Sequence, residues 1–174
     1  MIGVFDKKNI ILIGFMGVGK SKVGKALAKD LDMFYLDTDA LIKTRLNKKI
    51  RDIFEENGEK FFRQEEQRVA TWFKKNVKNT ILSTGGGFCV YVRDIQKLGK
   101  IILLHNSFDT IYNRLKSSQN WKKELQKRPL FKSYKEAQKL YEVREEIYKK
   151  HANLVIDMEE KSLKTIVQEI KQKI

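Results

Sequence analysis

Five short apolar runs alternate along the chain with segments of helical periodicity, and this alternation limits the possible folds more than any other feature. The runs are residues 9–14, 33–36, 80–83, 100–105 and 153–157. Helical patterns begin near residue 20, cover 40–76 in pieces, recur at 107–117 and 133–151, and resume after Ser162, a suitable N-cap. We therefore expect a three-layer α/β/α fold with a five-stranded parallel sheet, whose ligands bind beyond the carboxyl ends of the strands.

Length and composition indicate one globular domain spanning residues 1–174. Only one proline occurs and 41% of the residues are hydrophobic, which argues against a disordered chain. No apolar run reaches the roughly 18 residues that a membrane-spanning helix needs, and charged residues interrupt the N-terminus too early for a signal peptide. The single cysteine, Cys89, cannot form an intramolecular disulfide. These features predict a cytoplasmic protein with no membrane partner.

The charge balance raises the possibility of a nucleic-acid partner. The chain has 36 basic and 22 acidic side chains, a net charge of +14. The excess is spread over both halves, at +6 for residues 1–87 and +8 for residues 88–174, so neither half is a basic tail. Residues 114–135 carry eight basic side chains against Glu124 alone, which indicates a local anionic partner or a solvated loop.

The segment Gly14-Phe15-Met16-Gly17-Val18-Gly19-Lys20-Ser21 fits the phosphate-binding pattern G-x-x-x-x-G-K-[ST] between a predicted strand and a predicted helix. Glycines let the backbone turn its N–H groups toward a phosphate chain, and the helix N-terminus adds a positive partial charge. The Lys20 ammonium can then reach the β- and γ-phosphates, and the Ser21 hydroxyl can ligate Mg²⁺. The alternative is a glycine-rich turn that contains a lysine by chance.

Two carboxylates, Asp37 and Asp39, end the second predicted strand. In a strand, residues i and i+2 face the same side, so both side chains are expected in one cleft. One carboxylate could hold magnesium or its waters while the other orients a hydroxyl or receives its proton. Aspartate and threonine also favour N-caps, and a capping role ahead of residues 40–42 is compatible with function.

A second glycine loop, Gly85-Gly86-Gly87, follows the third predicted strand. Three consecutive glycines are costly in chain entropy, so the loop indicates that a ligand needs to approach bare backbone. A flexible turn is the alternative.

Three arginines are candidate anion ligands, because a guanidinium binds carboxylate or phosphate with two hydrogen bonds. Arg144 shares a helix face with apolar residues, where it would contact either a ligand anion or a glutamate of its own helix. Arg63 precedes Glu66 by three residues, so Glu66 either pairs with it or aims it at a ligand. Arg128 lies in the basic segment and could close over a γ-phosphate.

Together these motifs, with Ile53-Phe54, Gly58-Glu59, Phe62-Arg63 and Arg128-Pro129-Leu130, resemble the shikimate kinase family along nearly the whole chain. Nucleoside monophosphate kinases share the phosphate loop but not this order of Asp-x-Asp, Phe-Arg and Gly-Gly-Gly. The resemblance implies transfer of the ATP γ-phosphoryl group to the 3-hydroxyl of shikimate, in aromatic amino-acid biosynthesis. It also implies strand order 2-3-1-4-5, acceptor-binding helices at about 38–76 and a mobile lid at about 114–133.

The resemblance implies a role for each matching residue. Lys20, Asp39 and Arg128 would be catalytic, and Ser21 and Asp37 would hold Mg²⁺. The acceptor would bind to Asp39, Arg63, Gly85, Gly86, Gly87 and Arg144. ATP would bind to Gly17, Val18, Gly19, Lys20, Ser21, Lys22, Arg114 and Arg128. Lys22 departs from the family pattern, since many relatives have threonine there.

Two rival functions remain open on the sequence. A kinase for another small hydroxy acid, such as gluconate, would use the same scaffold. A basic nucleotide-dependent nucleic-acid-binding protein would instead explain the charge. The expected assignment is a monomer that acts on a small-molecule substrate and has no nucleic-acid partner.

Overall fold

The computed structural model describes residues 8–117 and 133–174, and its five strands form one parallel sheet of order β2-β3-β1-β4-β5. Each expected strand is found to within about one residue at either end. The expected order 2-3-1-4-5 is also confirmed. The strands are β1 (Ile10–Ile13), β2 (Phe34–Asp37), β3 (Thr80–Ser83), β4 (Lys100–His105) and β5 (Leu154–Asp157).

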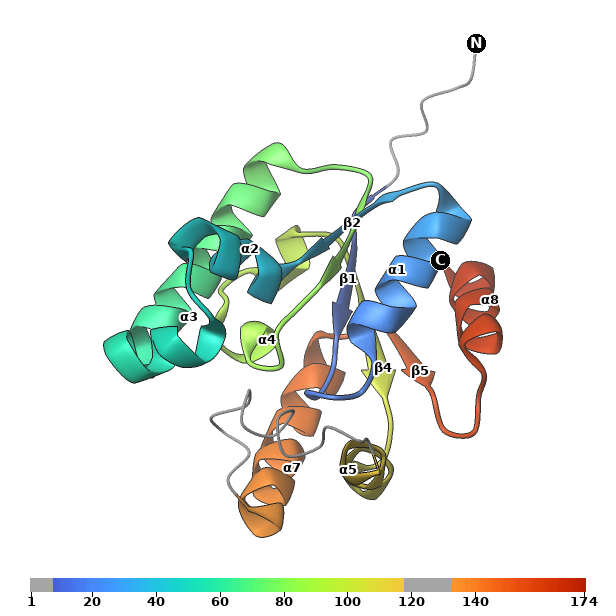
Figure 1. Ribbon diagram of the computed structural model, residues 1–174. Coiled ribbons are helices and arrows are strands. Elements are labelled where there is room, and N and C mark those ends of the chain that lie inside the picture. The colour runs from blue at the N-terminus through green and yellow to red at the C-terminus, as the bar shows by residue number, and fades with distance from the viewer. Residues whose placement is uncertain (1–7, 118–132) are drawn as a thin grey trace.

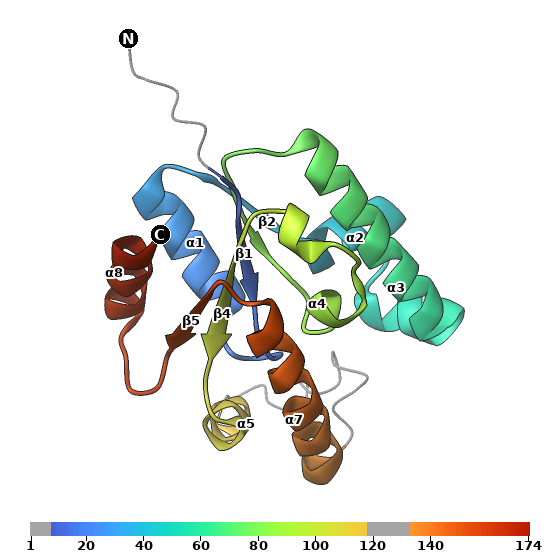
Figure 2. The same ribbon diagram turned by 180° about the vertical axis from the view of Figure 1, so that it is seen from behind.

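Helices cover both faces of the sheet, which gives the expected three layers. Helices α1 and α8 lie on one face, and α3, α4 and α7 lie on the other (Figures 1 and 2). The described helices are α1 (Lys20–Leu31), α2 (Thr38–Leu46), α3 (Ile50–Asn76), α4 (Phe88–Tyr91), the 3₁₀ turn η1 (Ile95–Lys97), α5 (Phe108–Lys116), α7 (Tyr134–His151) and α8 (Leu163–Lys173). Ser162 caps α8 as expected, because its hydroxyl accepts the Thr165 N–H.

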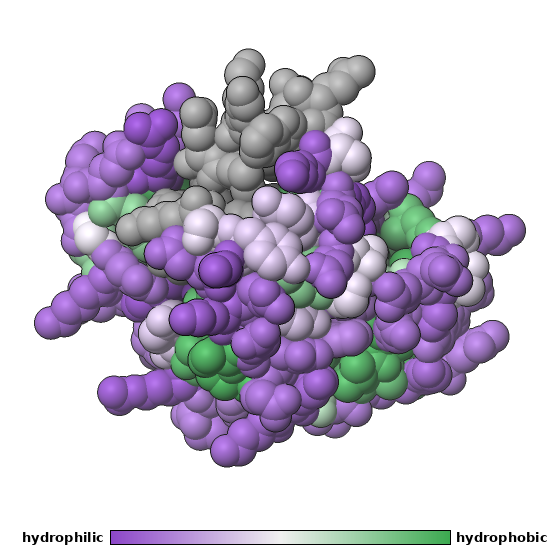
Figure 3. All heavy atoms as spheres, turned by 90° about the horizontal axis from the view of Figure 1, so that it is seen from below, coloured by the Kyte–Doolittle hydropathy of each residue, from purple (hydrophilic) through white to green (hydrophobic). Residues whose placement is uncertain are grey.

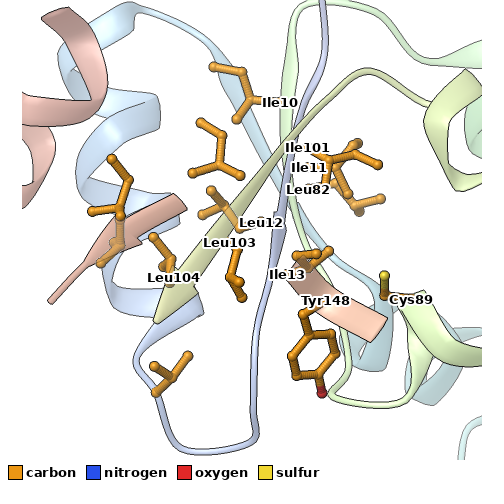
Figure 4. Packing of buried hydrophobic residues seen from close by; sticks show 14 of the residues in the cluster. Ile10, Ile11, Leu12, Ile13, Leu82, Cys89, Ile101, Leu103, Leu104 and Tyr148 are labelled. Carbon is orange, nitrogen blue, oxygen red and sulfur yellow. The ribbon is translucent and has the colours of Figure 1, made fainter. Parts of the chain in front are cut away.

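The main hydrophobic core follows the central strands. Every residue of β1 and β3 is buried, whereas β2 and β5 at the edges are partly exposed. A strand covered by helices on both faces needs apolar side chains throughout, which explains the uninterrupted sequence Ile10-Ile11-Leu12-Ile13. Figure 4 shows these side chains packing against residues of β3 and β4, with Tyr148 and Cys89 at one end of the cluster.

Helices α2 and α3 form a smaller unit with its own apolar cluster of Ile42, Ile53, Phe62 and Val69. The expectation of helix in pieces over this region is confirmed. The chain kinks inside α3 at Gly58, whose φ of 78° and ψ of 171° lie in a region that glycine adopts readily. The long part of α3 after this kink carries Arg63 and Glu66.

The carboxyl ends of the strands all point to one end of the molecule, where α4, α5 and α7 also lie (Figure 1). Seen from that end, the described surface is mostly hydrophilic, with separate apolar areas (Figure 3). No helix in the described ranges has the length and apolar character that crossing a bilayer requires. The side chains that are predicted to bind ligands therefore come together at the carboxyl ends of the strands.

Candidate active site

The glycine loop between β1 and α1 has the backbone conformation that its sequence predicts. Gly14, Gly17 and Gly19 have φ values of 141°, 82° and 109°, which side-chain-bearing residues rarely adopt. The buried Lys20 ammonium donates to the carbonyl oxygens of Gly14 at 2.7 Å and Phe15 at 2.9 Å. The loop thus places a lysine ammonium at the N-terminus of a helix, an arrangement suited to phosphate.

Ser21 and Asp37 meet although they come from different elements. The Ser21 hydroxyl donates to Asp37 Oδ2 at 3.1 Å, and Asp37 Oδ1 accepts the Ala40 N–H, also at 3.1 Å. Asp37 therefore caps α2, as one sequence interpretation expected, and at the same time contacts the phosphate loop through Ser21. A hydroxyl and a carboxylate are oxygen ligands of the kind that Mg²⁺ prefers when it also binds phosphates, so this pair fits the ion.

Asp39 lies in the first turn of α2 rather than in a strand, because β2 ends at Asp37. Burial raises the pKa of Asp39 to about 6, with a contribution from the Asp37 charge, while Lys20, Arg63 and Lys43 oppose the shift. Its Oδ1 atom is buried and has no hydrogen-bond partner within the described ranges. A buried oxygen of this kind is available to a ligand hydroxyl.

The triple-glycine loop has no room for side chains. A Cβ atom at Gly85 would lie 2.7 Å from Asp39 Oδ1, and one at Gly87 would lie 2.7 Å from Arg63 Cζ. The Gly85 N–H donates to the Thr38 hydroxyl at 2.8 Å, which ties the loop to the start of α2. These close approaches give a physical reason for glycine at both positions.

Arg63 is held by two carboxylates of its own helix. Its Nη1 donates to Glu66 Oε2 at 2.6 Å, while Nε and Nη2 donate to Glu59 Oε1 at 3.1 and 2.7 Å. The guanidinium carbon also lies 4.2 Å from the centre of the Tyr91 ring. Glu66 therefore pairs with Arg63, and both side chains lie next to the glycine loop.

Glu66 is a site residue that the sequence indicated only as a partner of Arg63. Its side chain is fully buried, and its Oε1 has no hydrogen-bond partner in the described part of the chain. Burial raises the pKa of Glu66 to about 7, and the Asp39 charge adds to the rise, whereas Arg63 and Arg144 oppose it. Glu66 precedes Val69 and Phe73 by three and seven residues, the spacing of one helix face, and both are buried on α3. This spacing was the sequence signal that could have identified Glu66 as buried.

Arg144 is 2% exposed, and its Nη2 atom has no hydrogen-bond partner among the residues that the structure describes. The alternative of an ion pair within α7 is not found in those residues. The neighbouring Glu145 instead contacts His105 at 2.8 Å and Lys149 at 3.0 Å. A Cβ atom at Gly86 would lie 3.5 Å from Arg144 Nη1, which places the guanidinium at the glycine loop.

The remaining predicted ligands differ in position. Arg114 Nη2 donates to the Gly17 carbonyl on the phosphate loop, and burial lowers the pKa of Arg114. Val18 is fully buried within the loop, and Lys22 is exposed on α1. Arg128 and most of the expected lid fall in 118–132, outside the described residues, and their roles stay predictions.

No group of three or more possible His, Cys, Asp or Glu metal ligands occurs in the described ranges.

Comparisons with known proteins identify the family of this chain. The sequence model of the shikimate kinase family matches residues 16–174. A shikimate kinase from Helicobacter hepaticus is 41% identical over 150 residues, covering 86% of each chain. One from Sulfurihydrogenibium is 39% identical, covering 96% of this chain and 98% of its own. The solved structure of an Acinetobacter baumannii shikimate kinase in complex with shikimate has a TM-score of 0.83 at 27% identity, covering 96% of this chain and 92% of that one.

Proposed function

Because the chain belongs to the shikimate kinase family, whose members transfer a phosphoryl group from ATP to a hydroxyl of shikimate, we propose how its residues divide this reaction. Two atoms at the triple-glycine loop carry the proposal. Asp39 Oδ1 and Arg144 Nη2 are both buried without partners in the described part of the chain, and they come from different elements. One offers an acceptor to a hydroxyl, and the other offers a donor to a carboxylate.

The acceptor acid binds between α3, α7 and the glycine loop. Arg144 and Arg63 bind its carboxylate, while Gly85, Gly86 and Gly87 let its ring approach the backbone. Asp39 orients the 3-hydroxyl. Its pKa of about 6 is close enough to neutral pH for the carboxylate to receive the hydroxyl proton. The hydroxyl oxygen then bonds to the γ-phosphorus as the bond from that phosphorus to ADP breaks.

The phosphate loop binds ATP through the backbone of Gly17 to Lys22 and the Lys20 ammonium. We propose that Ser21 and Asp37 hold Mg²⁺, since their oxygens meet at 3.1 Å beside the loop. When bound, this ion neutralises charge on the phosphates. Arg114, which contacts the loop at Gly17, is the proposed neighbour of the nucleotide.

We propose one kinase domain over 1–174, with acceptor-binding helices at 38–76, because the Sulfurihydrogenibium relative is matched over 98% of its length. We also propose a cytoplasmic monomer without a nucleic-acid or membrane partner. Sedimentation at 20.5 kDa, and only micromolar or weaker DNA binding at moderate salt, are the expected results.

The decisive experiment measures ADP release with MgATP and shikimate, gluconate, nucleoside monophosphates or no acceptor. We expect turnover with shikimate alone, and turnover with gluconate instead would favour the rival kinase.

Asp39→Asn should lower kcat by at least about 100-fold, within the usual range for a general base. Arg144→Ala should mainly raise KM for shikimate, because its contact exists before and during transfer.

Two exposed positions supply matched controls. Asp94→Asn changes an exposed carboxylate that pairs with Lys97, and Arg51→Ala removes an exposed arginine that pairs with Glu55. Both variants should keep the wild-type kcat and KM. Wild-type kcat in folded Asp39→Asn, or a higher KM for ATP rather than shikimate in Arg144→Ala, contradicts the corresponding role.

A further inference from the structure

Tyr148 connects helix α7 to the triple-glycine loop. Its side chain is 2% exposed, and it follows Arg144 by four residues, so both lie on the same face of α7. The Tyr148 hydroxyl donates a hydrogen bond to the carbonyl oxygen of Gly86. In Figure 4 its ring lies beside Cys89 at the end of the core, and its hydroxyl points away from the central strands.

Arg144 lies near the same hydroxyl. Burial raises the pKa of Tyr148, and the positive charge of Arg144 opposes this rise. A Cβ atom at Gly86 would lie 3.5 Å from Arg144 Nη1, so the guanidinium and the Gly86 carbonyl that Tyr148 holds are close together.

The contact falls at a point where the backbone needs an anchor. Three consecutive glycines sample more conformations than any other tripeptide, so their native arrangement is costly in entropy. Holding the Gly86 carbonyl also fixes the N–H of Gly87, because both belong to one planar peptide group. Gly86 itself lies between Arg144 and the phosphate loop, since a Cβ there would be 3.3 Å from the Met16 nitrogen.

We propose that Tyr148 is a positioning residue for the acceptor site: its hydroxyl holds the Gly86–Gly87 peptide beside the Arg144 guanidinium, in the arrangement that binds the acceptor acid. This inference rests on the proposed role of Arg144 in carboxylate binding. Without the hydroxyl, only a fraction of molecules has both groups in place. The apparent affinity for the acceptor is then the intrinsic affinity multiplied by that fraction. The nucleotide binds at the other glycine loop, so its affinity is unchanged.

The test is Tyr148→Phe, which removes one oxygen and keeps the ring in the core. We expect KM for shikimate to rise about tenfold, with kcat and KM for ATP within about twofold of wild type. The matched control is Tyr141→Phe, because Tyr141 is buried on the same helix and donates to a backbone carbonyl, that of Asn106 at 2.9 Å. This control should leave KM for shikimate unchanged.

A double-variant cycle separates positioning from general loss of structure. If Tyr148 acts through Arg144, the two substitutions are not independent. The fold-increase in KM of the double variant, Tyr148→Phe with Arg144→Lys, should then be smaller than the product of the two single fold-increases. Multiplicative effects, or an equal KM change in Tyr141→Phe, overturn the inference. If Arg144→Lys leaves KM for shikimate unchanged, the carboxylate role of Arg144 fails first, and this inference fails with it.

A second measurement does not depend on catalysis. Backbone ¹⁵N order parameters at Gly86 and Gly87 should fall in Tyr148→Phe from about 0.85 toward about 0.6, and should not fall in Tyr141→Phe. Thermal unfolding of both variants verifies that they are folded. Order parameters that stay at the wild-type value overturn the inference even if KM rises.

Discussion

Three buried polar atoms around the triple-glycine loop have no hydrogen-bond partner among the described residues: Asp39 Oδ1, Glu66 Oε1 and Arg144 Nη2. Each such atom costs roughly 1–3 kcal/mol when it stays unpaired, so a chain selected for stability alone would not gather them. Their chemistry is complementary to a small molecule with a carboxylate and hydroxyl groups. At the scale of single residues, the three unpartnered atoms support the proposed acceptor site, because they lower stability in the absence of a ligand.

Gly87→Ala tests the steric part of this arrangement. The backbone at Gly87 has φ −95°, which alanine adopts without strain, but the new Cβ would lie 2.7 Å from Arg63 Cζ. We expect the guanidinium to be displaced, so that KM for shikimate rises about tenfold, equivalent to about 1.4 kcal/mol. The free energy of unfolding should change by less than about 1 kcal/mol. Enzyme kinetics and urea unfolding on one preparation measure both, and an unchanged KM contradicts the expectation.

At the scale of elements, α2 and α3 carry Asp39, Arg63 and Glu66 on a unit with its own apolar cluster. The kink at Gly58 divides α3, so the part that carries Arg63 runs in its own direction against α2 and α4. Glu59, directly after the kink, holds Arg63 through two hydrogen bonds. The geometry of the proposed acceptor site thus depends on a local feature of the backbone.

Gly58→Ala should destabilise the protein. A φ of 78° with ψ of 171° is strained for alanine, and nothing lies within 4 Å of the added Cβ to compensate by packing. We expect the free energy of unfolding to fall by about 1–3 kcal/mol. The adjacent exposed residue supplies the control, since Asn57→Ala should change stability by less than about 0.5 kcal/mol. Equal values for the two variants in urea unfolding would show that the backbone carries no strain.

At the scale of the whole molecule, stability should depend on pH through Glu66. Burial raises its pKa from 4.5 to about 7, so between these values the folded protein binds more protons than the unfolded chain. Linkage then requires stability to decrease as pH rises through this window and to level off above it. Every titrating group contributes to the total, so a difference between variants is needed to isolate one.

Glu66→Gln supplies that difference. The variant loses the carboxylate, so its free energy of unfolding minus that of wild type should increase by about 1–3 kcal/mol from pH 5 to pH 8. The attraction between ionised Glu66 and Arg63 is already part of the Glu66 pKa, so its loss adds no separate pH dependence. Glu55→Gln, at an exposed pair with Arg51, should give a flat difference. A flat line for Glu66→Gln as well would mean that Glu66 keeps an ordinary pKa.

Much of the fold could be predicted because its signals are local. The apolar runs gave the five strands, and the glycine pattern located the phosphate loop. Asp39 shows the limit of such reasoning, because the prediction placed it beside Asp37 in a strand, whereas α2 begins at Thr38. The capping preference of Asp37 competes with strand continuation at this point, and the tertiary structure shows the helix starting there.

Local patterns in the sequence were enough to predict the elements, the phosphate loop and the candidate residues of the proposed acceptor site, because periodicity and backbone preferences act between near neighbours. Which of these side chains lie together depends on tertiary contacts. Tyr148 meets Gly86 across 62 residues of chain, and Glu66 and Arg144 reach the same loop from α3 and α7. Such partners are selected by how helices pack on the sheet, and this packing depends on contacts among the whole chain that no local pattern encodes.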